Sequence, residues 1–471
     1  MEAVSCPICS VSLKLLSERE REEHCDICLD SCSFLETNQN RKRAFSELEE
    51  ITITPTSTNE NHSPSSNGLI KQPRTAVNNS KWASILKGKE ASVDSPVKTG
   101  NNFISKQRQM PFYKVLRFGE QKIAVDAFNY NKIPNVTAYF LTHFHSDHYG
   151  GLGKTWSHGP IYCSPETARL VILQLKVDPQ YIHPVEFNKE VEINNIKVLF
   201  LDANHCPGAA IILFNRDVLH TGDFRASEDL IIELKKHHVQ LKTLYLDTTY
   251  LDPSRKFPPQ QTVIDTCAQL CSYLQSRPAR YDFFFQRNLK QKILVLVGTY
   301  TIGKERIAVG IAKALNTKIW ATPSKRKILE AIGDNQITDI LGETENECQV
   351  YLTYMNEVNL AKMKPRWNKW RNSYSQVIGI VPTGWTWKSS AQKFDLETLK
   401  NKNAYTSADQ GSIRVYKVPY SEHSSYAELE NFCHEIPCRN IISTVTSKNQ
   451  NILQQWQKQG KAKSDTKSSQ Y

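Results

Sequence analysis

Four potential metal ligands lie within six residues of one short stretch, and this stretch constrains the fold more than any other. The segment LTHFHSDHYGG, residues 141–151, carries His143, His145, Asp147 and His148 directly after a short apolar run. Only 13 histidines occur in 471 residues, so three of them beside an aspartate are improbable unless a cation holds them. Histidines two residues apart cannot share one helical face. The spacing therefore predicts a loop that leaves a β-strand and converges on one or more metal ions.

Three further candidate ligands follow downstream. His205 lies in ANHCPGAA, Asp223 in LHTGDFR and His423 in YSEHSSY. Each residue alone is typical of an ordinary polar loop. All three stand where an apolar, strand-like segment ends. This common position favours one shared site.

Length, charge and cysteine usage bound the class of protein. A chain of 471 residues exceeds one ordinary hydrophobic core. The net charge of +11 favours a polyanionic partner, nucleic acid first, over a merely basic surface. The start MEAVSCPICS lacks the features of a signal peptide, and no apolar run approaches the roughly 18 residues of a membrane span. Five of the 12 cysteines fall in the first 32 residues, which favours a local zinc site in a reducing compartment over a disulfide framework.

The motifs carry a family resemblance. THFHSDHYGG, ANHCPGAA and HTGDFR resemble the successive metal motifs of the metallo-β-lactamase fold. DTTY, at residues 247–250, and SEHSS around His423 resemble motifs of its β-CASP branch, which processes nucleic acids. GTYTIGKE, PTGW and YSEHSSYAEL narrow the resemblance to SNM-type DNA cross-link repair nucleases, from about residue 111 to 450. The resemblance implies an α/β fold: an αββα sandwich with an inserted α/β β-CASP domain.

The resemblance also implies a division of the candidate ligands between two cations. One cation would be held by His143, His145 and His205, the other by Asp147, His148 and His423, with Asp223 bridging both. Imidazole and carboxylate ligands suit zinc, and a pair of ions can act on a phosphodiester. Asp247 is expected to orient His423, while Asp126 and Thr142 are expected to brace the ligand loop. Asp147, His148, Asp223, Asp247 and His423 are the expected catalytic residues.

The segment GTYTIGKE imitates a nucleotide-binding loop but departs from it. Glu305 follows Lys304 where a Ser or Thr would be needed to bind magnesium, which argues against ATP. A strand-to-helix turn still offers free N–H groups to a phosphate. The resemblance implies a DNA phosphate at this place, and the expected contacts are Thr299, Tyr300, Lys304, Thr383 and Gly384.

A basic and aromatic segment, AKMKPRWNKWRN, follows at residues 361–372. Its cations and tryptophans suit a path for a single strand, by phosphate neutralisation and base stacking. A helix that packs Trp367 and Trp370 inward explains the pattern equally well. Both interpretations stay open at the level of sequence.

The activity implied by the resemblance is 5′-to-3′ hydrolysis of DNA with a free 5′ phosphate, in the nucleus, during repair of interstrand cross-links. In the family that the motifs resemble, RNA-processing members tend to place a histidine near the last strand and DNA-processing members a valine. RNIISTV ends at Val445, which favours DNA. An RNA endonuclease of the same fold is the alternative. A small-molecule hydrolase is disfavoured by the long insertion after Asp247. A non-catalytic scaffold is disfavoured because every ligand position is filled.

The amino terminus predicts a separate zinc finger. Cys6 and Cys9 can combine with Cys28 and with either His24 or Cys25 to hold one zinc ion. HCDICL resembles the end of UBZ-type ubiquitin-binding fingers, in which Asp26 would contact ubiquitin. The 14 residues between Cys9 and His24 exceed the spacing usual for that type.

The chain is thus expected to divide into six segments. These are a UBZ-like finger (1–33), a disordered linker poor in aromatic residues (34–110), a first metallo-β-lactamase segment (111–250), the β-CASP insertion (251–384), a second metallo-β-lactamase segment (385–455) and a polar tail (456–471).

Overall fold

The computed structural model describes residues 110–237, 239–276, 292–384, 393–401, 406–410, 412–445 and 449–468. The chain divides into two compact units, Met1–Arg108 and Gln109–Tyr471, and every described residue belongs to the second. The expected finger, with Cys6, Cys9, His24, Cys28 and Asp26, and nearly all of the expected linker lie outside the described residues. No helix within the described ranges is long and apolar enough to cross a membrane.

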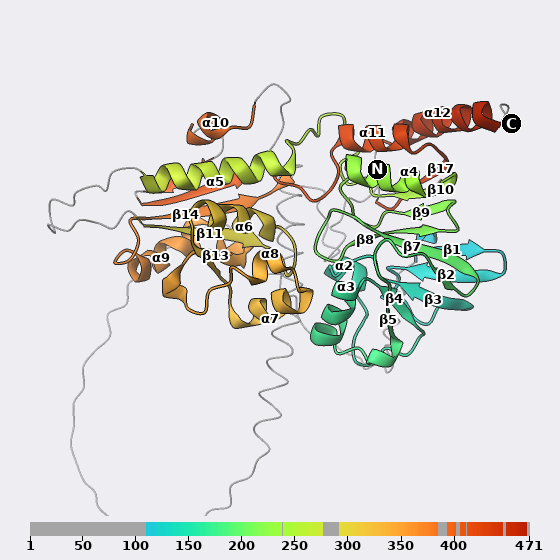
Figure 1. The fold of residues 1–471 in the computed structure, drawn as a ribbon, viewed down its shortest axis with the longest axis horizontal. Coiled ribbons are helices and arrows are strands. Elements are labelled where there is room, and N and C mark those ends of the chain that lie inside the picture. The colour runs from blue at the N-terminus through green and yellow to red at the C-terminus, as the bar shows by residue number, and fades with distance from the viewer. Residues whose placement is uncertain are drawn as a thin grey trace, which may run out of the picture. The chain divides into compact units, whose positions relative to one another are not determined.

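Two sheets pack face to face in the region of the chain that carries the first ligand cluster (Figure 1). The first sheet has the order β1 (Val115–Phe118), β2 (Gln121–Val125), β3 (Val136–Phe140), β4 (Ile161–Cys163), β5 (Ile182–Pro184). The second has the order β17 (Cys438–Ser443), β10 (Leu241–Leu246), β9 (Val218–His220), β8 (Ala210–Phe214), β7 (Ile196–Asp202), β6 (Val191–Ile193). One apolar cluster contains residues of both sheets, with the Phe140 and Phe214 rings 5.1 Å apart. This cluster is the core between them.

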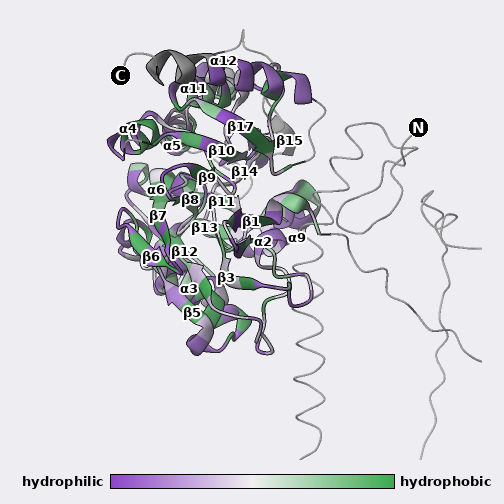
Figure 2. Cartoon of the chain, turned by 90° about the vertical axis from the view of Figure 1, so that its right-hand side faces the viewer, coloured by the Kyte–Doolittle hydropathy of each residue, from purple (hydrophilic) through white to green (hydrophobic). Residues whose placement is uncertain are grey.

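Helices cover the outer faces of these two sheets. They are α3 (Pro165–Leu170), α4 (Glu228–Lys236), α11 (Tyr426–Glu435) and α12 (Gln450–Ser468). In α4, Leu230, Ile231 and Leu234 are buried while the first and last turns carry charged residues, so one face packs inward. Both α4 and α12 carry hydrophilic and hydrophobic residues along their length (Figure 2). The arrangement is the αββα sandwich expected from the motifs.

A third sheet belongs to the insertion. Its order is β12 (Lys318–Trp320), β13 (Cys348–Tyr354), β11 (Ile293–Thr299), β14 (Gln376–Pro382), β16 (Ile413–Val418), β15 (Thr406–Gln410). The first five strands are parallel, and β15 is antiparallel. Every residue of β11 is buried, as expected of a parallel strand covered on both faces. The helices α5 (Gln260–Ser276), α6 (Glu305–Ala314), α7 (Pro323–Ile332), α8 (Asn335–Thr338), α9 (Leu360–Trp370) and α10 (Leu396–Lys400) complete this region.

The order of the third sheet creates a switch point beside β11. After β11 the chain continues to β12 and β13 on one side of it, and then to β14 and β16 on the other. In sheets of this kind, ligands bind at the carboxyl ends of the strands where the direction of winding reverses. Those ends are Thr299 in β11 and Pro382 in β14, inside the two motifs GTYTIGKE and PTGW.

Two boundaries differ from the sequence-based expectation. β16 pairs with β14, so the third sheet extends to Val418 rather than ending at 384. PTGW marks a strand end within the sheet and not the return to the sandwich. At the carboxyl end, α12 is helical through Ser468, where a polar tail was expected from 456, and Leu453 and Trp456 are buried.

The basic segment at 361–372 forms α9 and packs its aromatic residues inward. Trp370 and Met363 are buried, and Trp367 packs against the same apolar cluster. Lys362 and Arg366 both pair with Glu357. Of the two interpretations of this segment, the inward-packed helix accounts for the tryptophans.

Candidate metal centre

The candidate ligands stand where strands of the sandwich and of the insertion end. His143 and His145 follow β3, and Asp147 and His148 lie in the single turn α2 (Ser146–Tyr149). His205 follows β7, Asp223 follows β9 and His423 follows β16. Strand pairing and the apolar clusters hold these strands in place and bring residues separated by up to 280 positions together.

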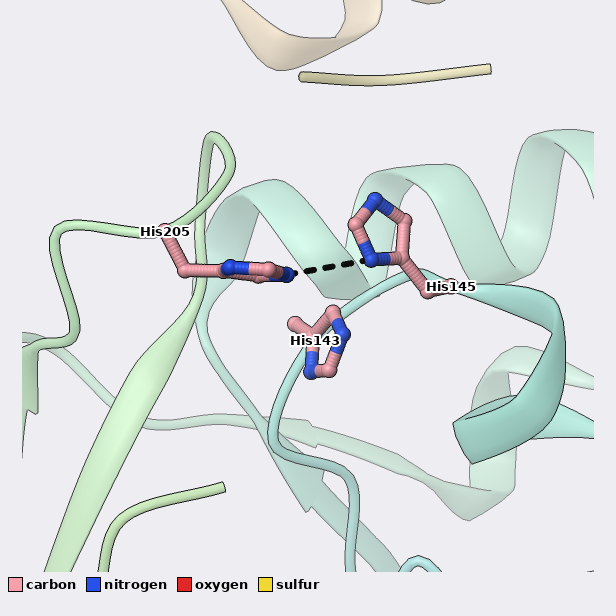
Figure 3. A group of neighbouring side chains, drawn as sticks. All are labelled: His143, His145 and His205. Atoms are coloured by element: carbon pink, nitrogen blue, oxygen red, sulfur yellow. Dashed lines mark hydrogen bonds between the residues drawn. The ribbon is translucent and has the colours of Figure 1, made fainter. Parts of the chain in front are cut away.

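Six of the seven predicted ligands converge. Three overlapping groups each place their ligand atoms within 4.8 Å of one another: His143, His145 and His205; His143, His148 and Asp223; His205, Asp223 and His423. The first group is drawn in Figure 3, where the three rings point toward one another. Oδ2 of Asp223 lies 3.4 Å from Nε2 of His148, 3.8 Å from that of His143 and 4.0 Å from that of His205. This carboxylate is therefore central, as a bridging ligand would be.

Asp147 lies at the margin of the site. Its side chain is 60% exposed, and its Oδ2 is 3.5 Å from Nε2 of His148. It belongs to none of the three groups found among the described residues. The structure places this carboxylate beside His148 and outside the converging set.

Carboxylates orient two of the rings. Nδ1 of His148 donates to Oδ2 of Asp126 at 2.7 Å, and Nδ1 of His423 donates to Oδ2 of Asp247 at 2.8 Å. A carboxylate only accepts, so in the neutral form of each ring the proton sits on Nδ1 and the Nε2 lone pair points into the site. Outer partners of this kind fix the tautomer and orientation of metal-binding histidines.

The other three rings are oriented by a hydroxyl and by backbone carbonyls. Nδ1 of His205 donates to the Glu422 carbonyl at 2.9 Å, and Nε2 of His145 donates to the Ile302 carbonyl at 3.1 Å. The Thr142 hydroxyl donates to Asp126 and therefore accepts from Nδ1 of His143, at 2.9 Å. His145 thus presents Nδ1 to the centre, whereas the other four rings present Nε2.

One unpaired atom shows that the set fits a cation. Nε2 of His143 is buried and has no hydrogen-bond partner among the described residues. Buried polar atoms are nearly always paired, so an orphaned ring nitrogen facing two other imidazoles and a carboxylate is suited to a metal ion. Imidazole nitrogens and a carboxylate are typical zinc ligands.

The electrostatics of the site divide its histidines into two classes. Burial, together with the neighbouring rings, holds the pKa of His143 and of His205 well below the usual value, so both are neutral. Burial also lowers the pKa of His148, but Asp223, Asp147 and Asp126 outweigh it and raise that pKa well above its usual value. The three carboxylates around His148 create a negative electrostatic potential, which a proton on the ring or a bound cation can neutralise.

Comparisons with known proteins agree with this geometry. A protein-family model described as "DNA repair metallo-beta-lactamase" matches residues 335–449. The DNA cross-link repair protein SNM1 of Arabidopsis thaliana is 40% identical over 347 residues, which cover 73% of this chain and 67% of that protein. The DNA cross-link repair protein pso2/snm1 of Schizosaccharomyces pombe is 33% identical over 463 residues, covering 94% and 75%.

The chain belongs to the SNM1/Pso2 family of DNA cross-link repair proteins. The 5′ exonuclease Apollo of Danio rerio is a more distant relative, 31% identical over 69% of this chain and 51% of its own length. The mixed α/β fold of this SNM1/Pso2 chain agrees with the DNA repair metallo-beta-lactamase family that matches residues 335–449.

The residues expected to bind a phosphate lie at the switch point of the third sheet. Lys304 is buried; its ammonium donates to the Pro382 carbonyl at 3.0 Å and lies 4.1 Å from the centre of the Tyr300 ring. Lys304 thereby joins the carboxyl ends of β11 and β14. The Tyr300 ring is partly exposed, and its centre lies 6.3 Å from that of His145.

The other three expected phosphate contacts are less accessible or lack a side chain. Thr299 is buried and its hydroxyl donates to the Thr353 carbonyl at 3.3 Å. The Thr383 amide donates to the Val418 carbonyl at 2.9 Å. At Gly384 a Cβ would lie 2.5 Å from the Tyr250 hydroxyl, so no side chain fits without a shift.

Sequence reasoning missed the roles of Glu422, Glu305 and Lys325, which are buried and contact residues 300–304. Burial raises the pKa of Glu422 to about 7, against the opposing effect of Lys304. Glu305 accepts from the Gly303 amide and from the Lys325 ammonium, each at 2.8 Å. Two features of the sequence could have pointed to these glutamates. Glu422 directly precedes the candidate ligand His423, and Glu305 stands in GTYTIGKE where a nucleotide-binding loop has Ser or Thr. Their partners are largely backbone atoms, which no motif encodes.

Proposed function

We propose that this SNM1/Pso2 protein is a metal-dependent phosphodiesterase, a 5′-to-3′ DNA exonuclease acting on 5′-phosphorylated DNA in the repair of interstrand cross-links. The observation that carries the proposal is the convergence of five histidines and Asp223 with one nitrogen of each ring held from outside. A relative named as a 5′ exonuclease supports the polarity. The basic charge of the chain supports a nucleic-acid substrate.

The proposed cofactor is zinc, as one or two ions. His143, His145 and His205 would hold one ion; His148 and His423 would hold the other with Asp147 as a candidate; Asp223 would bridge them. Divalent ions bound in this way acidify water and stabilise negative charge on phosphodiester oxygens. Asp126 and Asp247 keep the Nδ1 protons of His148 and His423 in place, so that both rings offer Nε2 to the site.

The proposed 5′-phosphate contacts are Thr299, Tyr300, Lys304, Thr383 and Gly384. Their support is the switch point: Lys304 joins the ends of β11 and β14, and Tyr300 lies beside His145. A terminal phosphate held there would fix both the register and the direction of the strand relative to the metal ligands. The Gly303 and Lys304 amides ahead of α6 already donate to Glu305 and Glu422, so the positive charge of Lys304 would complement that of the phosphate.

Digestion of labelled single strands tests the activity. Strands with a 5′ phosphate, strands with a 5′ hydroxyl and RNA strands are incubated with and without a chelator. We expect stepwise release of nucleotides from the 5′-phosphorylated DNA, weak cleavage of the hydroxyl form, and loss of both with chelator. Internal cleavage of RNA alone would support the RNA-processing alternative, and cleavage resistant to chelator would contradict the metal-dependent mechanism.

We propose further that residues 1–33 form a zinc finger that recruits the enzyme to ubiquitinated repair factors in the nucleus. The support is the set Cys6, Cys9, His24 or Cys25, and Cys28, with Asp26 beside it. A ubiquitin pull-down with the full chain and with Asp26→Ala tests the partner, and we expect the substitution to abolish capture. Failure of both proteins to bind would leave the finger a purely structural zinc site.

A further inference from the structure

Glu422 connects the metal centre to the insertion through two different atoms. Its backbone carbonyl accepts from Nδ1 of the candidate ligand His205 at 2.9 Å. Its carboxylate accepts from the backbone amide of Lys304 at 2.6 Å. Glu422 itself is 6% exposed. One buried residue thus contacts both a candidate metal ligand and the segment expected to bind phosphate.

The backbone of the segment Tyr300–Lys304, here called the 300–304 loop, is held by groups from several elements. The Lys325 ammonium, from α7, donates to the Tyr300 and Thr301 carbonyls at 2.9 and 2.7 Å. The Ile302 carbonyl accepts from the candidate ligand His145 at 3.1 Å. Each of these contacts fixes one peptide group of the loop. The loop therefore reaches the metal centre in a defined conformation.

The final peptides of the loop depend on carboxylates. The Gly303 amide donates to Glu305 at 2.8 Å, and the Lys304 amide donates to Glu422. Lys304 has a φ of 70°, the left-handed conformation that is unfavourable for a residue with a Cβ. An outside contact is needed to stabilise it. This conformation begins α6 and places the Lys304 ammonium at Pro382 and over the Tyr300 ring.

Gly303 permits the close approach of Glu422. At this position φ is 104°, and a Cβ would lie 2.8 Å from Oε2 of Glu422. A side chain there would force the carboxylate away from the loop. The sequence pair Gly303–Lys304, which imitates a nucleotide-binding loop, is thus adapted to contact a carboxylate of the chain itself.

We propose that Glu422 is a positioning residue: its carboxylate fixes the 300–304 loop relative to the metal ligands, so that a bound 5′ phosphate and the scissile bond are kept in register. The carboxylate acts through the Lys304 amide and not on the substrate. The proposal deepens the proposed function and depends on it for the kinetic measurement. The backbone measurement described below does not.

Three substitutions test the role of Glu422, with Glu430→Ala as the matched control. Glu430 is an exposed carboxylate of the following helix α11. For Glu422→Ala we expect KM for a 5′-phosphorylated single strand to rise about tenfold or more, because small misplacements of bound substrate have large effects. Glu422→Gln keeps an oxygen acceptor for the Lys304 amide and should stay close to the unsubstituted enzyme. Gly303→Ala should raise KM in the same way, because the added methyl group would push the Glu422 carboxylate away from the loop.

Zinc content should be unchanged in Glu422→Ala, because the carbonyl that orients His205 belongs to the main chain. Hydrogen exchange of the Lys304 amide provides a measurement independent of turnover, and we expect it to accelerate in Glu422→Ala and Gly303→Ala only. Unchanged KM and exchange in Glu422→Ala, or equal damage in Glu422→Gln, would overturn the proposal. If the unsubstituted protein leaves DNA intact while the exchange differences appear, the proposed function fails and the positioning contact stands.

Discussion

Nδ1 of His423 lies 2.8 Å from Oδ2 of Asp247, although 176 residues separate the two in the chain. Asp247 follows β10 of the sandwich, and His423 follows β16 of the third sheet. Oδ1 of the same carboxylate accepts from the Thr249 amide at 2.9 Å, so its orientation is fixed. Asp247 is buried, and it directs Nε2 of His423 toward Asp223.

Substitution Asp247→Ala is expected to weaken metal binding at His423. Losing an outer partner of a ligand typically reduces metal affinity or activity about 10- to 100-fold. Zinc titration against a chromophoric chelator measures the affinity, and digestion of a 5′-phosphorylated strand measures the activity. Asp252→Ala is a suitable control, since Asp252 lies in the same connection, five residues further along the chain. Unchanged zinc affinity in Asp247→Ala would exclude the orienting role.

The metal-free protein should lose stability as pH rises from 6.5 to 9. Burial lowers the pKa of His423, but Asp247 outweighs it and raises this pKa to about 9. A raised pKa contributes stability that is complete below the unfolded value of about 6.5 and is lost as pH rises through 9, here roughly 3 kcal/mol. His148 shifts in the same direction.

Thermal melts in chelator across this pH range measure the effect. Asp247→Ala removes the carboxylate that raises the pKa of His423, so its melting temperature should depend less steeply on pH. Parallel curves for the two proteins would show that His423 does not titrate as the structure indicates.

Substitution His143→Ala should remove zinc from the metal centre, but not from the proposed finger, and should abolish nuclease activity. The reason is that Nε2 of His143 is buried, unpaired among the described residues and surrounded by the other candidate ligands. Metal content by atomic emission is the direct measurement. His183→Ala is the control, because His183 is an exposed ring stacked on Tyr162, away from the site. Full zinc content in His143→Ala would place the metal elsewhere.

Substitution Trp370→Ala should destabilise the insertion without weakening DNA binding. Trp370 is buried in the apolar cluster below α9, and truncating a buried aromatic side chain costs about 3–5 kcal/mol. Denaturant unfolding measures the loss, and fluorescence anisotropy with a labelled strand measures the affinity. Trp367→Ala, at a partly buried position, should cost less. A large loss of DNA affinity at preserved stability would revive the stacking role for this segment.

The candidate ligands could be proposed from sequence because they stand in local strand-end patterns. His143, His145 and His148 are spaced for a strand-end loop, and the later candidates also follow strands. The structure brings six of the seven together and leaves Asp147 at the margin. The boundary at 384 could not be placed, since β16 joins the third sheet through hydrogen bonds to β14 that any backbone can make.

The sequence by itself determined which side chains can bind a cation, because the chemistry of imidazole and carboxylate belongs to residue identity. The tertiary structure decided which ring nitrogen each histidine presents. His145 offers Nδ1 because the Ile302 carbonyl accepts from Nε2, and His205 is oriented by the Glu422 carbonyl. Every residue has the same carbonyl group, so such contacts leave no trace in the sequence and arise only when distant segments meet.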